Sequence, residues 1–261
     1  MKIIAVSNQK GGVGKTTTCV NLAASLAATK RRVLLIDLDP QGNATTGSGV
    51  EKSAMKRTVY HVLIGKSTLK EVIQPSARGG FDVVPANRDL AGAEVELVNE
   101  IARETRLKAA LKEVQDEYDY VLIDCPPALS LITVNALTAA HAVMIPMQCE
   151  YFALEGLSDL VNTIKKVRQH LNPDLEIEGL LRTMFDNRNT LAQQVSGELA
   201  QHFGDKVYRT VIPRNIRLAE APSYGVPVLF HDRNSKGAQA YLALAGEIIN
   251  RHGRVRAAEA N

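Results

Sequence analysis

The chain of 261 residues contains no tryptophan, only 5% aromatic residues and three cysteines. Cys19, Cys125 and Cys149 lie far apart in the sequence and form no C-x-x-C pair. This spacing predicts neither a disulfide framework nor a zinc site. We therefore interpret each cysteine as a small buried side chain.

Long hydrophobic runs are also missing. No stretch approaches the roughly 18 unbroken apolar residues that indicate a membrane-spanning helix. The first predicted strand begins at Lys2 without the charged and apolar regions of a signal peptide. We therefore expect a cytoplasmic protein. A hydrophobic content of 45% and a charged content of 23% are ordinary for a globular domain.

Neither sign of charge dominates the composition. The net charge of +3 is too small by itself to indicate a nucleic-acid partner. The distribution is more informative, because acidic residues are frequent through 94–119 and basic residues gather in the C-terminal half. Those basic residues are Arg182, Arg188, Lys206, Arg209, Arg214, Arg217, Arg251, Arg254 and Arg256. The basic C-terminal half indicates a binding surface for a partner more clearly than the net charge does.

Apolar runs alternate with segments of helical periodicity along the whole chain. Such alternation predicts a single doubly wound, mostly parallel sheet with helices on both faces, and it places ligands at the carboxyl ends of the strands. The runs lie at 2–7, 32–39, 81–85, 118–124, 141–147, 177–185 and 207–212. No repeat or linker interrupts the pattern, so we expect one domain over 1–250. The basic tail 251–261 is small and polar, and we expect it to fray.

A phosphate-binding loop follows the first run. Residues 9–18 read Gln-Lys-Gly-Gly-Val-Gly-Lys-Thr-Thr-Thr. Glycines at 11, 12 and 14 leave out the Cβ atoms that keep a backbone from wrapping closely around phosphates, so successive N–H groups can point inward. Lys15 is expected to reach the β- and γ-phosphates, and the Thr16 hydroxyl to ligate Mg²⁺. The helix that starts near Thr16 directs its positive end at the same anion.

The loop departs from the usual pattern at two positions. The motif G-x-x-x-x-G-K-[ST] requires glycine where this chain has Gln9, and Lys10 adds a second lysine. An exposed lysine at the end of a strand is common. Two lysines that converged on one triphosphate from one short loop would repel each other. A geometry in which Lys10 points away, toward the nucleotide of a second subunit, avoids that repulsion.

The segment Lys-Gly-Gly-Val-Gly-Lys-Thr-Thr resembles the deviant Walker A motif of the ParA/MinD superfamily. The resemblance implies that ATP and Mg²⁺ are the cofactors and that Lys10 contacts phosphates across an ATP-sandwiched dimer. The implied nucleotide-binding residues of the loop are Lys10, Gly11, Gly12, Val13, Gly14, Lys15, Thr16 and Thr17. The role of Lys10 comes from the resemblance alone.

Three aspartates are expected near this nucleotide. Asp124 ends an apolar run and precedes Cys-Pro-Pro, so it resembles a Walker B aspartate, although a strand-end cap is the simpler alternative. Asp37 and Asp39 alternate on a predicted strand and so share one face. In the family the aspartate directly before Pro-Gln-Gly positions the attacking water. In this chain that aspartate is Asp39. The predicted metal site comprises Thr16, Asp124 and, in the outer shell, Asp37, and the catalytic residues are Lys10, Lys15 and Asp39.

The basic half resembles the family in the segment Ile-Pro-Arg-Asn-Ile-Arg. There Pro213 and Asn215 are implied to frame adenine, although both residue types are common in plain surface turns. Arg188 and Arg217 match positions that carry non-specific DNA contacts in chromosomal ParA-like proteins. Exposed arginines often have no such role, and DNA binding here should weaken steeply with salt.

The resemblance covers Lys2 to about Ile249 and is closest to short, Soj-like ParA ATPases. It implies an ATP-dependent dimer that coats nucleoid DNA, and a ParB-like partner that stimulates hydrolysis during chromosome or plasmid partition. A Min-type positioning ATPase on the membrane is the alternative, but the C-terminal residues show no amphipathic membrane anchor. A small-molecule ligase or kinase of the same fold remains a further alternative.

Overall fold

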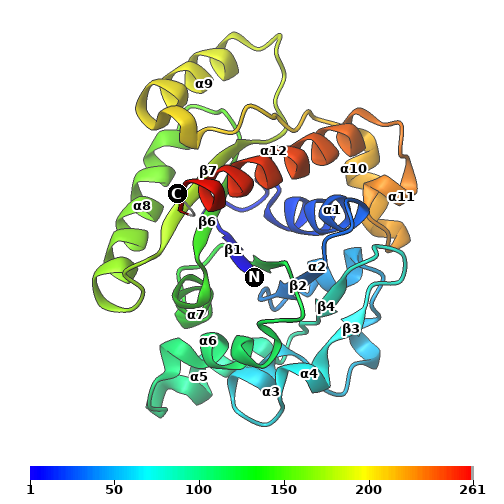
Figure 1. Ribbon diagram of the computed structural model, residues 1–261, viewed down its shortest axis with the longest axis vertical. Helices are drawn as coiled ribbons and strands as arrows, with labels where there is room; N and C mark the ends of the chain where they lie inside the picture. Colours follow the sequence, from blue (N-terminus) through cyan, green and yellow to red (C-terminus); the bar gives the residue numbers. More distant parts are fainter. Residues whose placement is uncertain (260–261) are drawn as a thin grey trace.

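A seven-stranded sheet forms the centre of the computed structural model, which describes residues 1–259 and the side-chain environments of residues 1–253 (Figure 1). The strand order is β3-β4-β2-β5-β1-β6-β7, and every pairing is parallel except that of the edge strand β3 with β4. The strands are β1 (Lys2–Val6), β2 (Val33–Asp37), β3 (Gln74–Pro75), β4 (Asp82–Val84), β5 (Tyr120–Asp124), β6 (Ala142–Met147) and β7 (Glu176–Arg182). The predicted mostly parallel sheet is confirmed.

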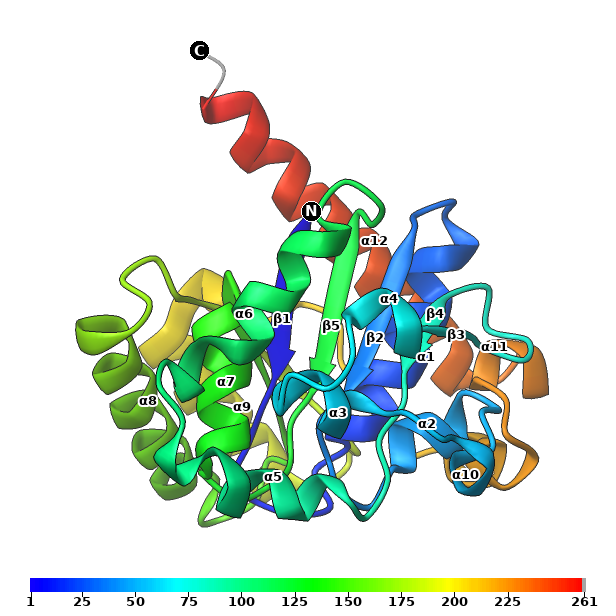
Figure 2. The ribbon, with the colours of Figure 1, turned by 90° about the horizontal axis from the view of Figure 1, so that it is seen from below.

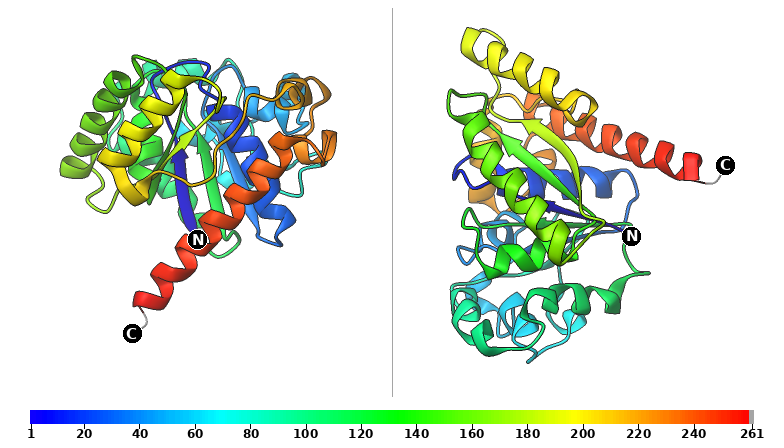
Figure 3. Two further views of the ribbon diagram at one scale, coloured as in Figure 1. Left: turned by 90° about the horizontal axis from the view of Figure 1, so that it is seen from above. Right: turned by 90° about the vertical axis from the view of Figure 1, so that its left-hand side faces the viewer.

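Helices cover both faces of the sheet. Helices α1 and α12 pack against each other on one face, while α6, α7 and α8 lie on the other (Figures 1 and 3). The helices are α1 (Lys15–Ala28), α2 (Asn43–Gly47), α3 (Val59–Leu63), α4 (Leu69–Val72), α5 (Leu90–Glu96), α6 (Arg106–Leu111), α7 (Leu131–Ala139), α8 (Ala153–His170), α9 (Thr190–Phe203), α10 (Ile216–Glu220), α11 (Val228–His231) and α12 (Lys236–Glu259). Six short 3₁₀ turns lie between them.

Strand β1 shows how the sequence creates two cores. Ile3 and Ala5 belong to the apolar cluster on the α7 side, whereas Ile4 and Val6 belong to the cluster on the α1 and α12 side. Successive side chains of a strand point to opposite faces, so a strand covered on both sides must be apolar throughout. The continuous apolar runs of the sequence therefore correspond to buried parallel strands. All three cysteines are buried and free, as predicted.

The run at 207–212 does not form the predicted strand. Only two isolated pairings occur there, Leu180 with Val207 and Phe185 with Pro213. The backbone N–H groups of Arg209 and Thr210 donate to the carboxylate of Glu247 on α12, each at 2.9 Å. Because a side chain satisfies these two donors, the segment lies beside β7 without forming a continuous ladder with it.

The helix α12 extends through residues that we expected to fray after position 250. Two side chains attach this part to the body of the protein. Arg251 pairs with Glu247 at 2.8 Å, and its guanidinium lies 4.3 Å from the ring centroid of Tyr208. His252 lies 2.8 Å from Glu178 on β7 and stacks on Tyr120. These contacts hold the turn that contains residues 251 and 252, so the expected boundary at 250 does not coincide with the end of the helix.

The ends of three central strands lie side by side. In the register of the sheet, Asp124 of β5 is level with Val6 of β1 on one side and with Asp37 of β2 on the other. Figure 2 shows β1, β2 and β5 pointing to the same edge of the molecule. The loop after β1 and both aspartates therefore meet at this edge.

Candidate functional site: a phosphate-binding loop with two diverging lysines

The loop between β1 and α1 has the backbone shape that its glycines predict. Gly12 and Gly14 have φ angles of 74° and 88°, a region that side chains bearing a Cβ rarely adopt. Gly14 ends the loop, and α1 begins at Lys15. The first N–H groups of α1 have no partner within the helix and face the loop. This is a strand, a glycine-rich loop and a helix in the order that phosphate binding requires.

Two tethers that the sequence analysis did not identify fix the shape of the loop. Asn8 donates from Nδ2 to the carbonyl of Pro146 on β6 at 2.8 Å, and its Oδ1 accepts the N–H of Lys10 at 3.0 Å. Thr183, just past β7, donates from Oγ1 to the carbonyl of Val13 at 2.7 Å. The loop is therefore held from two neighbouring strand ends. Nothing in the sequence around Asn8 or Thr183 marks these contacts.

The two lysines of the loop point in different directions. Lys15 is 7% exposed and donates from Nζ to the carbonyl of Lys10 at 3.0 Å, so its ammonium lies inside the loop. Burial lowers the pKa of Lys15, although Asp124 opposes the shift. The side chain of Lys10 is 46% exposed, and its Nζ lies 2.5 Å from Glu150, in the loop between β6 and α8. Lys10 thus adds no charge to the interior of its own loop.

Asp124 is fully buried at the end of β5 and is suited to a cation. Among the described residues its Oδ2 has no hydrogen-bond partner, and its Oδ1 accepts a weak contact from Cys19 Sγ at 3.6 Å. Burial raises the pKa of Asp124, and the nearby Asp37 raises it further, whereas the Thr16 hydroxyl favours the charged form. A carboxylate beside a hydroxyl is the oxygen donor set that Mg²⁺ takes next to substrate phosphates.

The described residues contain no cluster of three or more His, Cys, Asp or Glu side chains that would enclose a metal ion by itself. A Mg²⁺ ion beside nucleotide phosphates takes few protein ligands and completes its shell with phosphates and water. Thr16 and Asp124 are the residues that would hold it.

Asp37 and Asp39 are adjacent, but not in the way that strand alternation predicts. Strand β2 ends at Asp37, so Asp39 lies beyond it. Both oxygens of Asp37 organise the following loop: Oδ2 accepts from the N–H and hydroxyl of Thr45 at 2.8 and 2.7 Å, and Oδ1 accepts from Asp39 N–H at 3.1 Å. Asp39 is partly exposed and accepts the N–H of Gln41 at 2.9 Å. Asp37 supports the loop, and Asp39 remains accessible.

A cavity of about 280 Å³ adjoins the start of α1. It is lined by Thr16, Thr17, Val20, Asn21, Asn43, Thr46, Gly47, Ala221, Pro222 and Val226. Pro213 and Asn215 do not line it. Both are partly exposed, and Asn215 caps α10 by accepting the N–H groups of Arg217 and Leu218 at 3.0 and 3.3 Å. The Oδ1 atom of Asn215 thus has a structural role, and its Nδ2 donates to no described protein group.

The two predicted DNA-binding arginines lie on neighbouring segments, since Phe185 and Pro213 form a bridge. Each is held by carboxylates. Arg188 forms two parallel contacts with Asp186 at 3.0 and 2.9 Å, and its side chain is 90% exposed. Arg217 pairs with Glu220 at 2.8 Å and with Asp232 at 3.4 Å. Sequence reasoning placed the arginines but did not identify these acidic partners.

Comparison with known proteins agrees with this geometry. A family model described as an AAA domain matches residues 1–177. The chain is 57% identical over 247 residues to the sporulation initiation inhibitor protein Soj of Bacillus subtilis, covering 95% of this chain and 98% of Soj. It is 53% identical over 250 residues to the chromosome partitioning protein ParA of Myxococcus xanthus, covering 96% and 88%. The chain belongs to the ParA/MinD family of P-loop ATPases.

Solved structures show the same fold. The chain is 39% identical to a Mycobacterium smegmatis protein named cobyrinic acid a,c-diamide synthase, which was solved with bound ADP and magnesium. The TM-score is 0.85, and the match covers 97% of this chain and 96% of that one. The cell division ATPase MinD of Pyrococcus furiosus is 26% identical, with a TM-score of 0.79 over 95% of this chain and 98% of MinD.

Membership of the ParA/MinD family confirms the resemblance inferred from the loop. The roles of individual side chains remain predictions. Within residues 1–259, none of the helices has the length and apolar character needed to cross a bilayer. The sequence does not indicate the role of Glu150, which follows β6 and holds the side chain of Lys10.

Proposed function

We propose that this protein is an ATP-dependent dimerising switch that binds DNA without sequence specificity and partitions chromosome or plasmid DNA with a ParB-like partner. The proposal places it in the cytoplasm, on the nucleoid. The observation that supports it most is the divergence of the two loop lysines. Lys15 lies within its own loop, whereas the Nζ atom of Lys10 lies on the outside beside Glu150, where a second subunit could reach it.

The proposed chemistry uses few side chains, because phosphoryl transfer depends mainly on positioning and charge neutralisation. Lys15 binds the terminal phosphates, and Thr16 and Asp124 hold Mg²⁺, which neutralises phosphate charge when bound. Asp39 orients the attacking water, and Lys10 of the second subunit offsets charge on the transferred group. Asp37 positions Asp39, since the two are joined by a hydrogen bond of 3.1 Å.

Exposed aromatic residues beside Lys10 support a dimer at this face. Tyr151 and Phe152 directly follow Glu150, are 75% and 69% exposed, and contact each other edge to face at 5.0 Å. Large exposed aromatic side chains are enriched at protein–protein interfaces. A second subunit that covered the phosphate loop would also bury these two rings.

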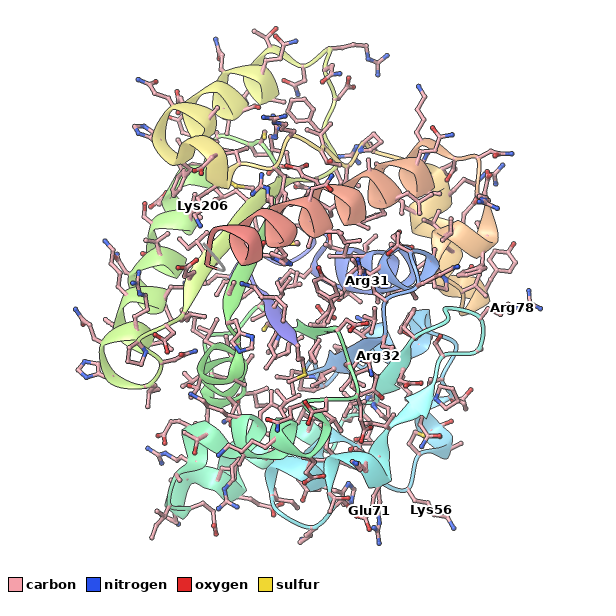
Figure 4. All side chains as sticks on the ribbon, in the orientation of Figure 1. Arg31, Arg32, Lys56, Glu71, Arg78 and Lys206 are labelled. Atoms are coloured by element: carbon pink, nitrogen blue, oxygen red, sulfur yellow. The ribbon has the colours of Figure 1, made fainter. Side chains whose placement is uncertain are left out.

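The proposed DNA surface is formed by Arg188 and Arg217 together with Arg214, whose positive charge helps to lower the pKa of Asp186, the partner of Arg188. Other cations are spread over the molecule: Lys206 lies beside β7 and Lys56 at the opposite edge, whereas Arg78 lines a cavity with Tyr224 and His231 beside α11 (Figure 4). Lys206 faces Glu176 at 3.9 Å. With a small net charge and one local arginine group, a single subunit offers few contacts to DNA phosphates. A dimer carries two copies of the group and so doubles these contacts, which fits DNA binding that is switched by dimerisation.

Co-sedimentation with random-sequence DNA under ATP, ADP and no nucleotide tests the proposal. We expect retention with ATP only, and loss of retention as salt is raised. Equal retention of the protein on DNA in all three conditions would contradict the proposed ATP-dependent switch. Vesicles of anionic lipid in place of DNA test the Min-type alternative, which requires ATP-dependent membrane binding. Phosphate transfer to a metabolite, without DNA binding, would instead support the ligase or kinase alternative.

A further inference from the structure

A stripe of exposed apolar side chains runs along the end of α5 and the 3₁₀ turn that follows it. Val95, Val98 and Ile101 are 76%, 54% and 90% exposed. Val95 in α5 and Val98 in the 3₁₀ turn are one turn apart and share a side of the helical segment, and Ile101 follows them just after the extended residue Glu100. Ala102 then takes a left-handed backbone with φ of 55° and ends the stripe. Contiguous exposed apolar side chains with a polar rim mark interaction surfaces.

The stripe is held rigidly from behind. Leu90, Ala93 and Leu97 of the same segment are fully buried and belong to the core on the α7 side. The front is fixed as well, because Arg103 donates to the carbonyl of Val98 and Arg106 pairs with Glu100 at 2.7 Å. A surface that is held in place before binding loses less conformational entropy when a partner binds.

The rim of the stripe is acidic, unlike the protein as a whole. Residues 94–106 contain four glutamates and two arginines, in a chain whose net charge is +3. The two arginines pair with Glu104 and Glu100, which leaves Glu94 and Glu96 without a cationic partner in this segment. Glu96 accepts a hydrogen bond from the uncharged Tyr60 hydroxyl, and Glu94 forms no ion pair within the described residues. The apolar stripe therefore lies in a locally negative field, which favours a positively charged occupant.

The position of the stripe relates it to the nucleotide edge. Helix α5 contacts α7, and a short loop joins α7 to β5, which carries Asp124. Figure 2 shows α5 at the edge of the molecule toward which β1, β2 and β5 point. A molecule bound to α5 would therefore lie on the same side of the sheet as the phosphate loop.

We propose that Val95, Val98 and Ile101, with Glu94, Glu96 and Glu100 around them, form a docking surface for a basic amphipathic helix of a protein partner. We call these six residues the α5 surface. The three exposed apolar side chains would cover the apolar face of a bound helix, and the glutamates match lysines or arginines beside that face. A second copy of this chain fits less well, because a symmetric contact would bring the acidic rims together. The inference deepens the partner role in the proposed function, but the binding itself needs neither DNA nor ATP hydrolysis.

The test uses a fluorescein-labelled 20-residue helical peptide with leucine on one face and lysine on the other, and fluorescence anisotropy with the full-length protein. Ile101→Glu and Val98→Glu are matched with Leu191→Glu, because Leu191 is an exposed apolar residue at the start of α9, 41% exposed. We expect Ile101→Glu to weaken binding at least about tenfold and Leu191→Glu to leave it within about twofold. A peptide with glutamate in place of lysine should not bind.

Failure of the lysine peptide to bind the wild-type protein, or equal weakening by Ile101→Glu and Leu191→Glu, would overturn the proposal. A photo-crosslinker at position 101 provides a second measurement. Crosslinks to the peptide support the α5 surface, whereas crosslinks between two copies of the chain would assign it to the dimer instead. Ile101→Glu should retain ATP-dependent co-sedimentation with DNA, so loss of peptide binding and failure of the proposed switch are separate results.

Discussion

The ammonium group of Lys10 forms an ion pair with the carboxylate of Glu150 at 2.5 Å, while the backbone carbonyl of the same lysine accepts a hydrogen bond from Lys15. One residue thus contributes its carbonyl to the interior of the loop and its side chain to the exterior. Both members of the ion pair are about half exposed, so the pair stabilises this arrangement by no more than about 1 kcal/mol. A phosphate group on a second subunit could displace Glu150 at little cost.

Asp39→Ala should retain ATP binding and dimerisation but lose turnover by at least about a hundredfold, because water would no longer be oriented. Phosphate release measures turnover, and light scattering with ATP measures the dimer. Asp37→Ala is the comparison, since Asp37 holds Thr45 and the loop through three hydrogen bonds. We expect that variant to lose stability as well as activity. Undiminished hydrolysis by Asp39→Ala would show that the assignment is wrong.

A larger residue in the loop should block the dimer while ATP stays bound to the monomer. Gly11 is the sharper position, because a Cβ added there meets nothing within 4 Å of the monomer and the φ angle is not positive. Gly12 has a φ of 74°, so Gly12→Val also strains the loop. We expect Gly11→Val to bind ATP within about threefold of wild type and to stay monomeric by light scattering. An ATP-dependent dimer of both variants would contradict the sandwich.

Arg188→Ala and Arg217→Ala should each weaken DNA binding and lower the dependence of log K on log salt by about one. Arg57→Ala is the matched control, because Arg57 is also exposed and paired, with Glu71 at 3.1 Å. Asp186→Asn should have the opposite effect, since it releases the guanidinium of Arg188. Arg188 lowers the pKa of Asp186 to about 2, so this carboxylate stays charged and competes with phosphate across the working range. Unchanged salt dependence in both arginine variants would exclude this surface.

The attachment of α12 to β7 should depend on pH. Burial would raise the pKa of Glu178, but His252 and Lys2 outweigh it and the net shift is downward. Because the folded pKa lies below the unfolded value, the carboxylate stabilises the fold above the unfolded pKa, and this contribution is lost as pH falls through the folded pKa. Glu178→Gln should cost about 1–2 kcal/mol in urea unfolding at neutral pH and much less in acid. An equal cost at both pH values would contradict the ion-pair account.

The parts of the fold that could be predicted are those with one dominant local signal. The buried strands were visible as apolar runs, and the loop glycines were visible because positive φ angles exclude most other residues. The segment 207–212 resembled a strand, yet Glu247, nearly forty residues away, satisfies its N–H groups. Apolar periodicity contains no information about such a long-range partner.

In the site, too, the features with a local sequence signal could be predicted and those that depend on a distant residue could not. Lys15, Thr16 and Asp124 lie at the same edge of the sheet because the ends of adjacent parallel strands meet there, and their roles stay predictions. Asn8, Thr183 and Glu150 were missed because each acts through one contact with a distant loop, and nothing around them in sequence marks that contact. Pro213 and Asn215 lie outside the cavity beside α1, so their assignment to adenine still depends on the resemblance.

Lys10→Ala and Lys15→Ala should fail at different steps. Lys15 lies inside the loop, so Lys15→Ala should weaken ATP binding by at least about tenfold. Lys10→Ala should bind ATP within about threefold of wild type and lose hydrolysis, whereas Glu150→Gln should keep most of its activity because the exposed pair contributes little. A similar loss of ATP binding in both lysine variants would show that Lys10 binds the nucleotide of its own subunit.

Mixing two inactive variants tests most directly whether Lys10 acts across the dimer. When Lys10→Ala and Asp39→Ala subunits are combined with ATP, each mixed dimer contains one site with its own Asp39 and a Lys10 from the partner. Random pairing should therefore restore about a quarter of wild-type ATPase activity, since half of the dimers are mixed and each has one complete site. A pull-down with one tagged subunit verifies that mixed dimers form. Mixed dimers that form but hydrolyse no ATP would show that Lys10 serves only its own nucleotide.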